Sequence, residues 1–197
     1  MKACVLTVDQ HSSRAGTDLV PDAVTQYGAG ALLGFERTAG DEIQALFVDP
    51  GAVATTLADL IRSDAWHIGI GIGAVDEPLP DSARAGRGTA YVHARSAVTR
   101  AKNAPGRISV VTDSDYGERL ETVLWLWAAL LARRTRGGWE VADLVAEGLT
   151  HTQVAERLGV SQSAVSQRGR AAGLVEDQRA RSLVTDLIGE ALADPAR

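Results

Sequence analysis

The sequence predicts an α+β N-terminal domain followed by an all-α C-terminal domain. Up to about residue 112, short apolar runs of strand length alternate with helical stretches. Beyond that point the apolar residues recur only at helical spacing. A length of 197 residues accommodates one medium domain or two small ones, and 45% hydrophobic with 23% charged residues is typical of a globular protein.

The N-terminal part is predicted to be a sheet whose strands are joined by helices. Its first strand alternates two faces of side chains, and two apolar runs on either side of a turn at 38–41 indicate a hairpin. The element order is βαββαβ, the ferredoxin-like pattern. The predicted elements are, in chain order, strand 2–9, helix 18–27, strands 31–37 and 42–48, helix 50–62, strand 66–73, helix 89–102 and strand 107–113.

The strand at 66–73 has one bare face. Gly69, Gly71 and Gly73 share that face, while isoleucines occupy the other. Glycine weakens a strand, so a glycine face indicates the close approach of something else. We expect a helix packed tightly on the sheet, with a bound ligand as the alternative. The glycines are not a dinucleotide fingerprint, because no helix begins after them at the required spacing.

Two further helices are apolar enough to need packing partners. The stretch 116–136 is apolar on nearly all sides and includes Trp125 and Trp127. We therefore expect this helix to be buried on several sides. We also expect it to link the two domains and to pack in a dimer. A C-terminal helix carries one apolar stripe, which serves either packing on its own domain or dimerisation. That stripe consists of Leu183, Val184, Leu187, Ile188, Ala191 and Leu192.

The strongest motif is a helix-turn-helix within GLTHTQVAERLGVSQSAVSQRGRAAGL, over about 150–172. Thr150 can cap its first helix, with Gln153 completing a capping box. Gly159 suits the left-handed turn, and Ser161 can cap the second helix. The small Ala155 permits close helix crossing. This spacing resembles the helix-turn-helix of bacterial transcription regulators and sigma-factor-like modules, with apolar contacts from Val154, Leu158, Val160 and Val165.

The second helix of this motif is expected to enter the major groove of double-stranded DNA with its N-terminal part. Gln can read adenine, Arg can read guanine, and Ser can reach bases or phosphates. A hairpin used only for protein contact is the alternative, but this face has little apolar surface to bury. An interior Gly169 predicts fraying after Arg168, because it costs about 1 kcal/mol relative to Ala. The expected DNA-binding residues are Ser161, Gln162, Ser163, Ser166, Gln167, Arg168 and Arg170.

Composition limits the cellular setting. Cys4 is the only cysteine, which excludes an internal disulfide and favours a reducing compartment. No signal-peptide pattern is recognised, and the longest apolar run, 123–132, is shorter than the roughly 20 residues of a membrane span. We therefore expect a cytoplasmic protein. The net charge of −5 does not exclude DNA binding, because phosphate contact needs only a local basic face, with candidates Arg133, Arg134, Arg136, Arg157, Arg168 and Arg170.

Two aspartates are brought together by the predicted topology. In a ferredoxin-like sheet the end of the first strand lies beside the hairpin of the next two strands. Asp9 ends the first strand and Asp41 lies in that hairpin. Paired carboxylates suit Mg²⁺ held together with phosphate. The pair is therefore a candidate metal or nucleotide site, and the alternative is that each Asp only stabilises a turn.

Three segments of residues 1–112 resemble the SatD family of bacterial proteins: VLTVDQHSSR, RTAGDEIQALF and IGIGIGAVDEPLPDSARAGRGTAYVHAR. That family is similar to the catalytic domain of class III nucleotide cyclases and to the palm of nucleic-acid polymerases. In cyclases, the acid ending strand one and the acid of the hairpin hold two metal ions. The resemblance places Asp9 and Asp41 at these positions. It extends to actinobacterial proteins that join such a domain to a helix-turn-helix.

The resemblance to cyclases fails where catalysis would need it. Cyclases carry an Asn and an Arg four residues apart on the helix after the glycine strand. If Ala94 is aligned between them, these positions hold Val92 and Ser96, while His93 and Arg95 lie on other helix faces. Without the Arg, nothing evident stabilises the charge of a transferring phosphoryl group. We therefore expect a binding domain on a cyclase-like fold, with no catalytic residues.

The function that the sequence favours is a bacterial transcription regulator that binds double-stranded DNA as a homodimer. Its N-terminal domain senses a ligand, such as a nucleotide with Mg²⁺, or acts as a dimer platform. The alternatives are a nucleotide-processing enzyme with an attached DNA-binding module, and a DNA-associated scaffold without a ligand. The expected parts are the cyclase-like domain 1–112, a linker helix 113–137, the DNA-binding domain 138–175 and a C-terminal helix 176–197 with dimerisation as one role.

Overall fold

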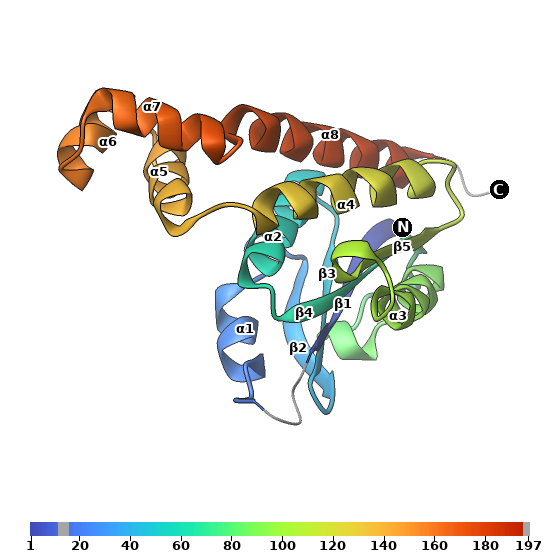
Figure 1. Ribbon diagram of the computed structural model, residues 1–197. Helices are drawn as coiled ribbons and strands as arrows, with labels where there is room; N and C mark the ends of the chain where they lie inside the picture. The colour runs from blue at the N-terminus through green and yellow to red at the C-terminus, as the bar shows by residue number, and fades with distance from the viewer. Residues whose placement is uncertain (12–15, 195–197) are drawn as a thin grey trace.

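The computed structural model describes residues 1–11 and 16–194. Parts of two predictions, the SatD-like segment at 12–14 and the C-terminal helix at 195–197, lie outside the described residues. Figure 1 shows a sheet with helices on both faces and a helical arm that extends from it. The elements are β1 (Lys2–Gln10), α1 (Val20–Gln26), β2 (Leu33–Ala39), β3 (Glu42–Phe47), α2 (Pro50–Ser63), β4 (Trp66–Ala74), α3 (Thr89–Ala101), β5 (Ile108–Thr112), α4 (Gly117–Ala132), α5 (Arg136–Ala146), α6 (His151–Leu158), α7 (Gln162–Ala171) and α8 (Leu174–Ala193).

The sheet has the strand order β2-β3-β1-β4-β5. Strand β1 lies at its centre and runs antiparallel to both β3 and β4, and β2 pairs antiparallel with β3. The β4–β5 pair is parallel, because α3 crosses over between these strands. An α+β N-terminal part followed by helices alone is therefore confirmed. The observed strands and helices up to β5 agree with the predicted ranges to within a few residues.

The glycine face of β4 packs directly against α3. A Cβ atom built on Gly69 would lie 2.2 Å from the backbone nitrogen of Val98, and one on Gly71 would lie 2.2 Å from that of Ala94. One on Gly73 would lie 2.5 Å from the Thr89 hydroxyl. No side chain fits in these spaces, so the glycines let the helix backbone approach the strand. The prediction of a tightly packed helix is confirmed.

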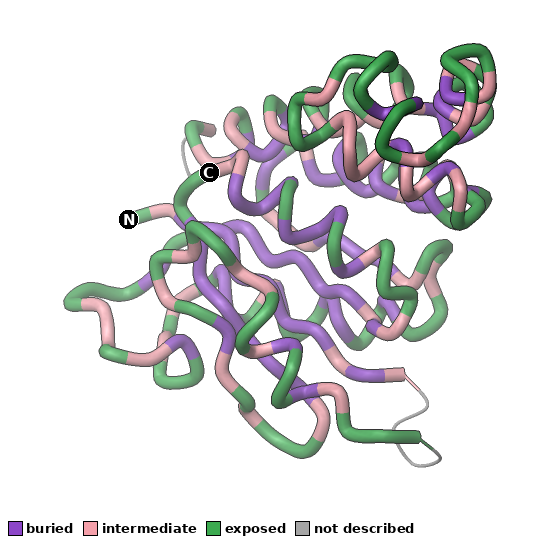
Figure 2. The backbone as a smooth tube through the Cα atoms, turned by 90° about the vertical axis from the view of Figure 1, so that its left-hand side faces the viewer, coloured by how far each residue is buried: buried purple, intermediate pink, exposed green. Residues whose placement is uncertain are grey.

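The opposite face of the sheet carries the main hydrophobic core. Figure 2 shows that buried residues concentrate in the strands and in the inner faces of the helices that cover them. Helices α2, α4 and α8 contribute to this core, so the C-terminal helix returns to the sheet. Its apolar stripe packs within the chain: Val184, Leu187, Ile188 and Ala191 are buried, while Leu183 is 45% exposed. The stripe therefore gives no independent argument for a dimer.

Helix α4 is shorter than the predicted 116–136. It ends at Ala132, and α5 begins at Arg136. The cause is local, because the Thr135 side chain accepts a hydrogen bond from the Gly138 N–H at 3.2 Å and so caps α5.

Burial of α4 on several sides is only partly observed. One face of α4 enters the core through Leu120, Leu124, Trp127 and Leu131. Its outer face is open, and the Leu126 side chain there is 68% exposed. None of the described helices combines the length and apolarity that crossing a membrane requires.

Candidate functional site

Helices α5, α6 and α7 form the arm, which has a small core of its own. Val141, Val154 and Val165, one from each helix, are completely buried and in contact. Ala155 is also nearly buried, as expected for a close crossing of α6 and α7. Partly buried side chains, Leu158 among them, surround this centre. Packing of the three helices therefore fixes the direction in which α7 presents its outer face.

The connection between α6 and α7 follows the predicted turn chemistry. The Gln153 N–H donates to the Thr150 hydroxyl at 3.4 Å, and the Gln153 side chain accepts from the Thr150 N–H at 2.8 Å, which makes a capping box. Gly159 is left-handed at φ 65°. The Ser161 hydroxyl accepts from the Ala164 N–H at 3.1 Å. These local bonds satisfy helix ends that would otherwise be unpaired.

Six of the seven expected DNA-binding residues lie together. Residues 162, 163, 167 and 170 are exposed and residue 166 is half-exposed, and at helical spacing these five share one face, while Ser161 is exposed at the N-cap just before them. We call this set the α7 face: Ser161, Gln162, Ser163, Ser166, Gln167 and Arg170. Arg168 is the exception. It is half-buried and lies near the start of α5, where a Cβ on Gly137 would be 3.6 Å from its Nε.

The predicted fraying after Arg168 is not observed. Helix α7 continues to Ala171, and Gly169 is buried within it. A Cβ on Gly169 would lie 3.1 Å from Cδ1 of Leu174, which comes from the start of α8. The side chain of Leu174 therefore fills the space that a larger residue at 169 would occupy, and Arg170 stays on a continuous helix.

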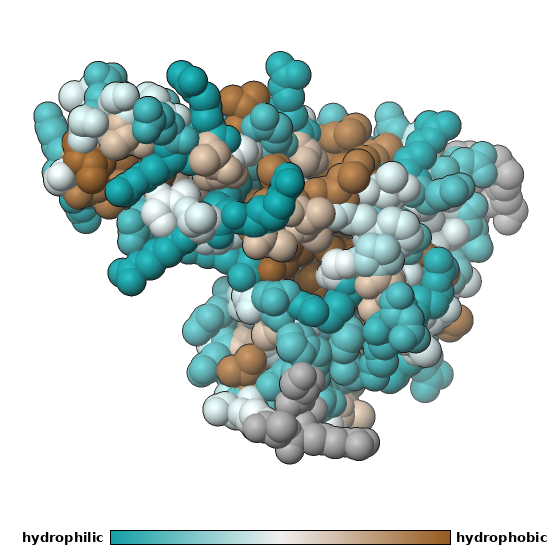
Figure 3. Space-filling model, viewed as in Figure 1, coloured by the Kyte–Doolittle hydropathy of each residue, from teal (hydrophilic) through white to brown (hydrophobic). Residues whose placement is uncertain are grey.

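The arm is less acidic than the rest of the chain. Residues 136–171, which span α5 to α7, contain four arginines and four acidic residues, a net charge of 0, whereas the whole chain has −5; two of the four arginines are in α7. Helix α7 contains no acidic residue, and polar side chains cover most of the arm in the view of Figure 3. A local positive balance such as that of α7 is what contact with phosphates needs.

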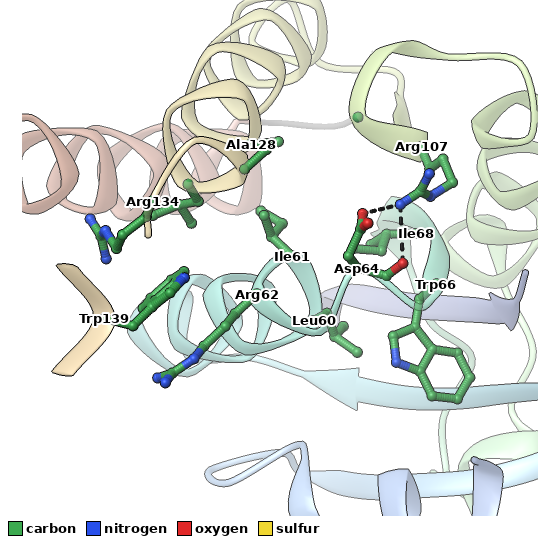
Figure 4. Close-up of a pocket in the computed structure, with 13 residues that line it drawn as sticks. Leu60, Ile61, Arg62, Asp64, Trp66, Ile68, Arg107, Ala128, Arg134 and Trp139 are labelled. Atoms are coloured by element: carbon green, nitrogen blue, oxygen red, sulfur yellow. Dashed lines mark hydrogen bonds and ion pairs between the residues drawn. The ribbon is translucent and has the colours of Figure 1, made fainter. Parts of the chain in front are cut away.

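Arg134 does not belong to the basic surface that the sequence analysis assigned to it. Its side chain is 1% exposed, and it donates to the Ala172 carbonyl at 3.0 Å and to the Asp177 carboxylate at 2.9 Å. Its guanidinium lies 4.3 Å from the ring centre of Trp139, and Arg62 lies equally close to that ring. Figure 4 shows Trp139 between the two arginines. This stack joins the arm to α2, α4 and α8.

A second contact holds the arm at the same place. Arg62 of α2 donates to Asp143 of α5 through two bonds of 2.6 and 2.9 Å. A bidentate pair of this kind fixes geometry as well as charge. Arg62, Arg134 and Trp139 line part of a cavity of about 180 Å³, which is also lined by Asp64 and Arg107 (Figure 4).

The two aspartates predicted to meet do line one cavity. The Gln10 N–H donates to the Asp41 carbonyl at 3.2 Å, which places the end of β1 beside the hairpin, and Asp9 and Asp41 both line a space of about 700 Å³. The same space is lined by cations and imidazoles that the sequence analysis missed: Arg37, His67, His11 and Lys102.

Charges within this cavity are partly paired. The Lys102 ammonium lies 3.3 Å from the Asp9 carboxylate. A hydrogen bond from Arg37 holds the pKa of the Asp18 carboxyl below its usual value. Burial lowers the pKa of His67 and favours its neutral form, although Asp9 acts in the opposite direction. The cavity therefore offers both signs of charge to a ligand.

Asp9 and Asp41 fit a metal ion only if that ion is also bound by ligands from outside the protein, such as phosphate oxygens. Among residues 1–11 and 16–194, no group of three or more His, Cys, Asp or Glu side chains is placed to hold a metal ion. Asp9 and Asp41 can each supply carboxylate oxygens, and Mg²⁺ is commonly held by one or two carboxylates plus substrate phosphates. The site fits such a shared arrangement and does not fit a cage built by the protein alone.

The positions that would carry the cyclase Asn and Arg lie on the outer side of α3. Val92 is 68% exposed, and Ser96 is also exposed. Neither lines the aspartate cavity. Their neighbours have structural contacts: His93 bonds to the Ile72 carbonyl at 2.9 Å, and Arg95 pairs with Glu42 at 2.8 Å.

Comparison with protein-family models, with curated proteins and with solved structures gives no match.

Proposed function

We propose that the protein is a DNA-binding transcription regulator whose arm is a helix-turn-helix. The observation that carries this proposal is the α7 face, a continuous polar surface without acidic residues on a helix held by α5 and α6. Gln and Arg side chains on such a face have the hydrogen-bonding groups that read base edges in the major groove. A hairpin for protein contact is disfavoured, because the face has no large apolar side chain.

The N-terminal part is proposed to have a ferredoxin-like, cyclase-related fold that senses a ligand. Its first four strands lie in the order β2-β3-β1-β4 with all neighbours antiparallel, which supports this fold, and β5 is an added parallel strand. The aspartate cavity, with Lys102 and Arg37 beside the carboxylates, supports a nucleotide phosphate with Mg²⁺ as the ligand. The alternative of a nucleotide-processing enzyme has less support, because Val92 and Ser96 supply no transition-state stabiliser.

A mobility-shift assay tests the DNA-binding proposal. Wild-type protein is titrated onto genomic fragments in the presence of competitor DNA, and one or more fragments should be retained specifically. Gln167→Ala should weaken that binding by about 1–3 kcal/mol, because it removes a base contact. Gln26→Ala is the matched control, since Gln26 is an exposed glutamine at the end of α1, far from the arm in sequence. Equal retention of every fragment by wild type would overturn the proposal.

A further inference from the structure

A groove separates the arm from the sheet part on the side of α2 and α8. Its volume is about 650 Å³, within the roughly 300–1,000 Å³ of small-molecule sites. Val145 of α5 and Leu174 and Val175 of α8 give it apolar lining. Val175 is 62% exposed, although it is a large apolar residue. None of the sites expected from the sequence includes this groove.

Two charged groups of opposite sign also line the groove. Asp59 of α2 has no hydrogen bond or ion pair within the described part of the chain, because the neighbouring Arg62 is taken by Asp143. Partial burial raises the pKa of the Asp59 carboxyl, against the pull of Arg181 and Arg62. Asp59 is exposed at the groove, so its carboxylate is accessible to a cationic group of a ligand.

Arg181 of α8 lines the groove as well. It donates one bond of 3.4 Å to the Thr55 hydroxyl, and its guanidinium lies 5.6 Å from the ring centre of Trp127. A guanidinium has five N–H donors, so most of its donors stay available to an acceptor. Asp177, which also lines the groove, is already held by Arg134 and by the Trp127 indole N–H. Asp59 and Arg181 are thus the two charges that a ligand can use.

We propose that this groove binds a small zwitterion with an apolar body, of the class of an α-amino acid with an apolar side chain. Its ammonium group donates to Asp59, and its carboxylate accepts from Arg181. The apolar side chain packs against Val145, Leu174 and Val175. A ligand held in this way touches α2, α5 and α8 at once, and so it stabilises one orientation of the arm.

A second space, lined in part by the same residues, lies beside the α7 face. That space, of about 600 Å³, shares His151, Leu174 and Val175 with the groove and is lined also by Ser166 and Arg170. A ligand in the groove therefore lies next to two residues of the α7 face. Because the two spaces are adjacent, we expect the ligand to affect DNA binding, and this expectation rests on the proposed function. The binding of the ligand itself does not depend on the proposed function.

Isothermal titration calorimetry on the full chain without DNA tests the inference. The probes are L-leucine and L-phenylalanine, with phenethylamine and 3-phenylpropionate as analogues that each lack one charge. Saturable binding of at least one amino acid is expected, with the analogues weaker by about tenfold or more, because each loses a charge-assisted contact. No saturable heat from either amino acid up to about 10 mM would overturn the proposal, as would an analogue that binds equally well.

Two variants locate the site. Asp59→Asn should weaken amino-acid binding by about tenfold or more while circular dichroism shows an intact fold, because this side chain has no partner to lose. Asp186→Asn makes the same change of charge at an exposed position of α8 outside the groove, and its affinity should equal that of wild type. Wild-type affinity in Asp59→Asn would overturn the proposal. Since no DNA is present, the result is independent of whether the arm binds DNA.

Discussion

Replacement of Arg134 tests how the arm is held. Arg134→Ala removes the bonds to the Ala172 carbonyl and to Asp177, together with the stack on Trp139. The Asp177 side chain is 17% exposed and, among the described residues, then keeps only the Trp127 indole as a partner. Removal of one member of a buried ion pair typically costs about 3–5 kcal/mol, because the remaining charge stays buried and poorly compensated. For a chain of this size, a loss of 3 kcal/mol in the free energy of unfolding lowers the melting temperature by roughly 6–12 °C.

Arg136→Ala is the matched control. It removes the same type of side chain two residues away, but the Arg136 side chain is 95% exposed and its ion pair is with Glu140, one helical turn on. Such a surface pair contributes about 0.3–0.5 kcal/mol. Urea unfolding followed by tryptophan fluorescence measures both variants, since Trp127 and Trp139 adjoin Arg134. A loss below about 1 kcal/mol in Arg134→Ala, or equal losses in both variants, would refute the buried-pair argument.

Three further predictions concern the sheet part and the assembly. Mg²⁺ with ATP or GTP should raise the melting temperature. At a ligand concentration a hundred times the dissociation constant, the gain corresponds to about 2.7 kcal/mol of stability, and Asp41→Asn should abolish it. An unchanged wild-type melting curve would reduce Asp9 and Asp41 to structural roles. We expect no cyclic nucleotide from ATP or GTP with Mg²⁺ or Mn²⁺, and synthesis that disappears in Asp41→Asn would contradict this. Light scattering should report a homodimer, and Leu126→Glu should disrupt it. The reason is that hydrophobic side chains gather along α4 and α8 in Figure 3 and that Leu126 is 68% exposed. A wild-type monomer at tens of micromolar would contradict this prediction.

Features set by short-range chemistry could be predicted from the sequence. The capping box at Thr150, the left-handed Gly159 and the cap at Ser161 depend on residues a few positions apart. The glycine face of β4 also followed from strand alternation alone. The predicted end of α4 was wrong although a local signal existed, because Thr135 lies three residues before Gly138 and can cap a new helix there.

Features that depend on distant residues could not be predicted in the same way. Leu174 compensates for Gly169 from the next helix, so the glycine alone suggested a weaker helix than the one observed. The sequence suggested that Arg134 is a surface cation. In the structure its side chain is 1% exposed and pairs with Asp177 of α8, which lies 43 positions away in the sequence. Lys102 reaches Asp9 because α3 ends beside β1, which requires knowledge of how the helix lies on the sheet.

Selection of bound sequences from a random pool of duplex DNA tests the central claim most directly. We predict that wild-type protein enriches a defined motif, because the α7 face presents Gln, Ser and Arg side chains, the types that can hydrogen-bond to base edges. Arg170→Ala should relax base preference at one position, whereas Arg168→Ala, which removes the same charge from the other side of α7, should recover the same motif. A wild-type pool that remains random after selection would contradict the claim.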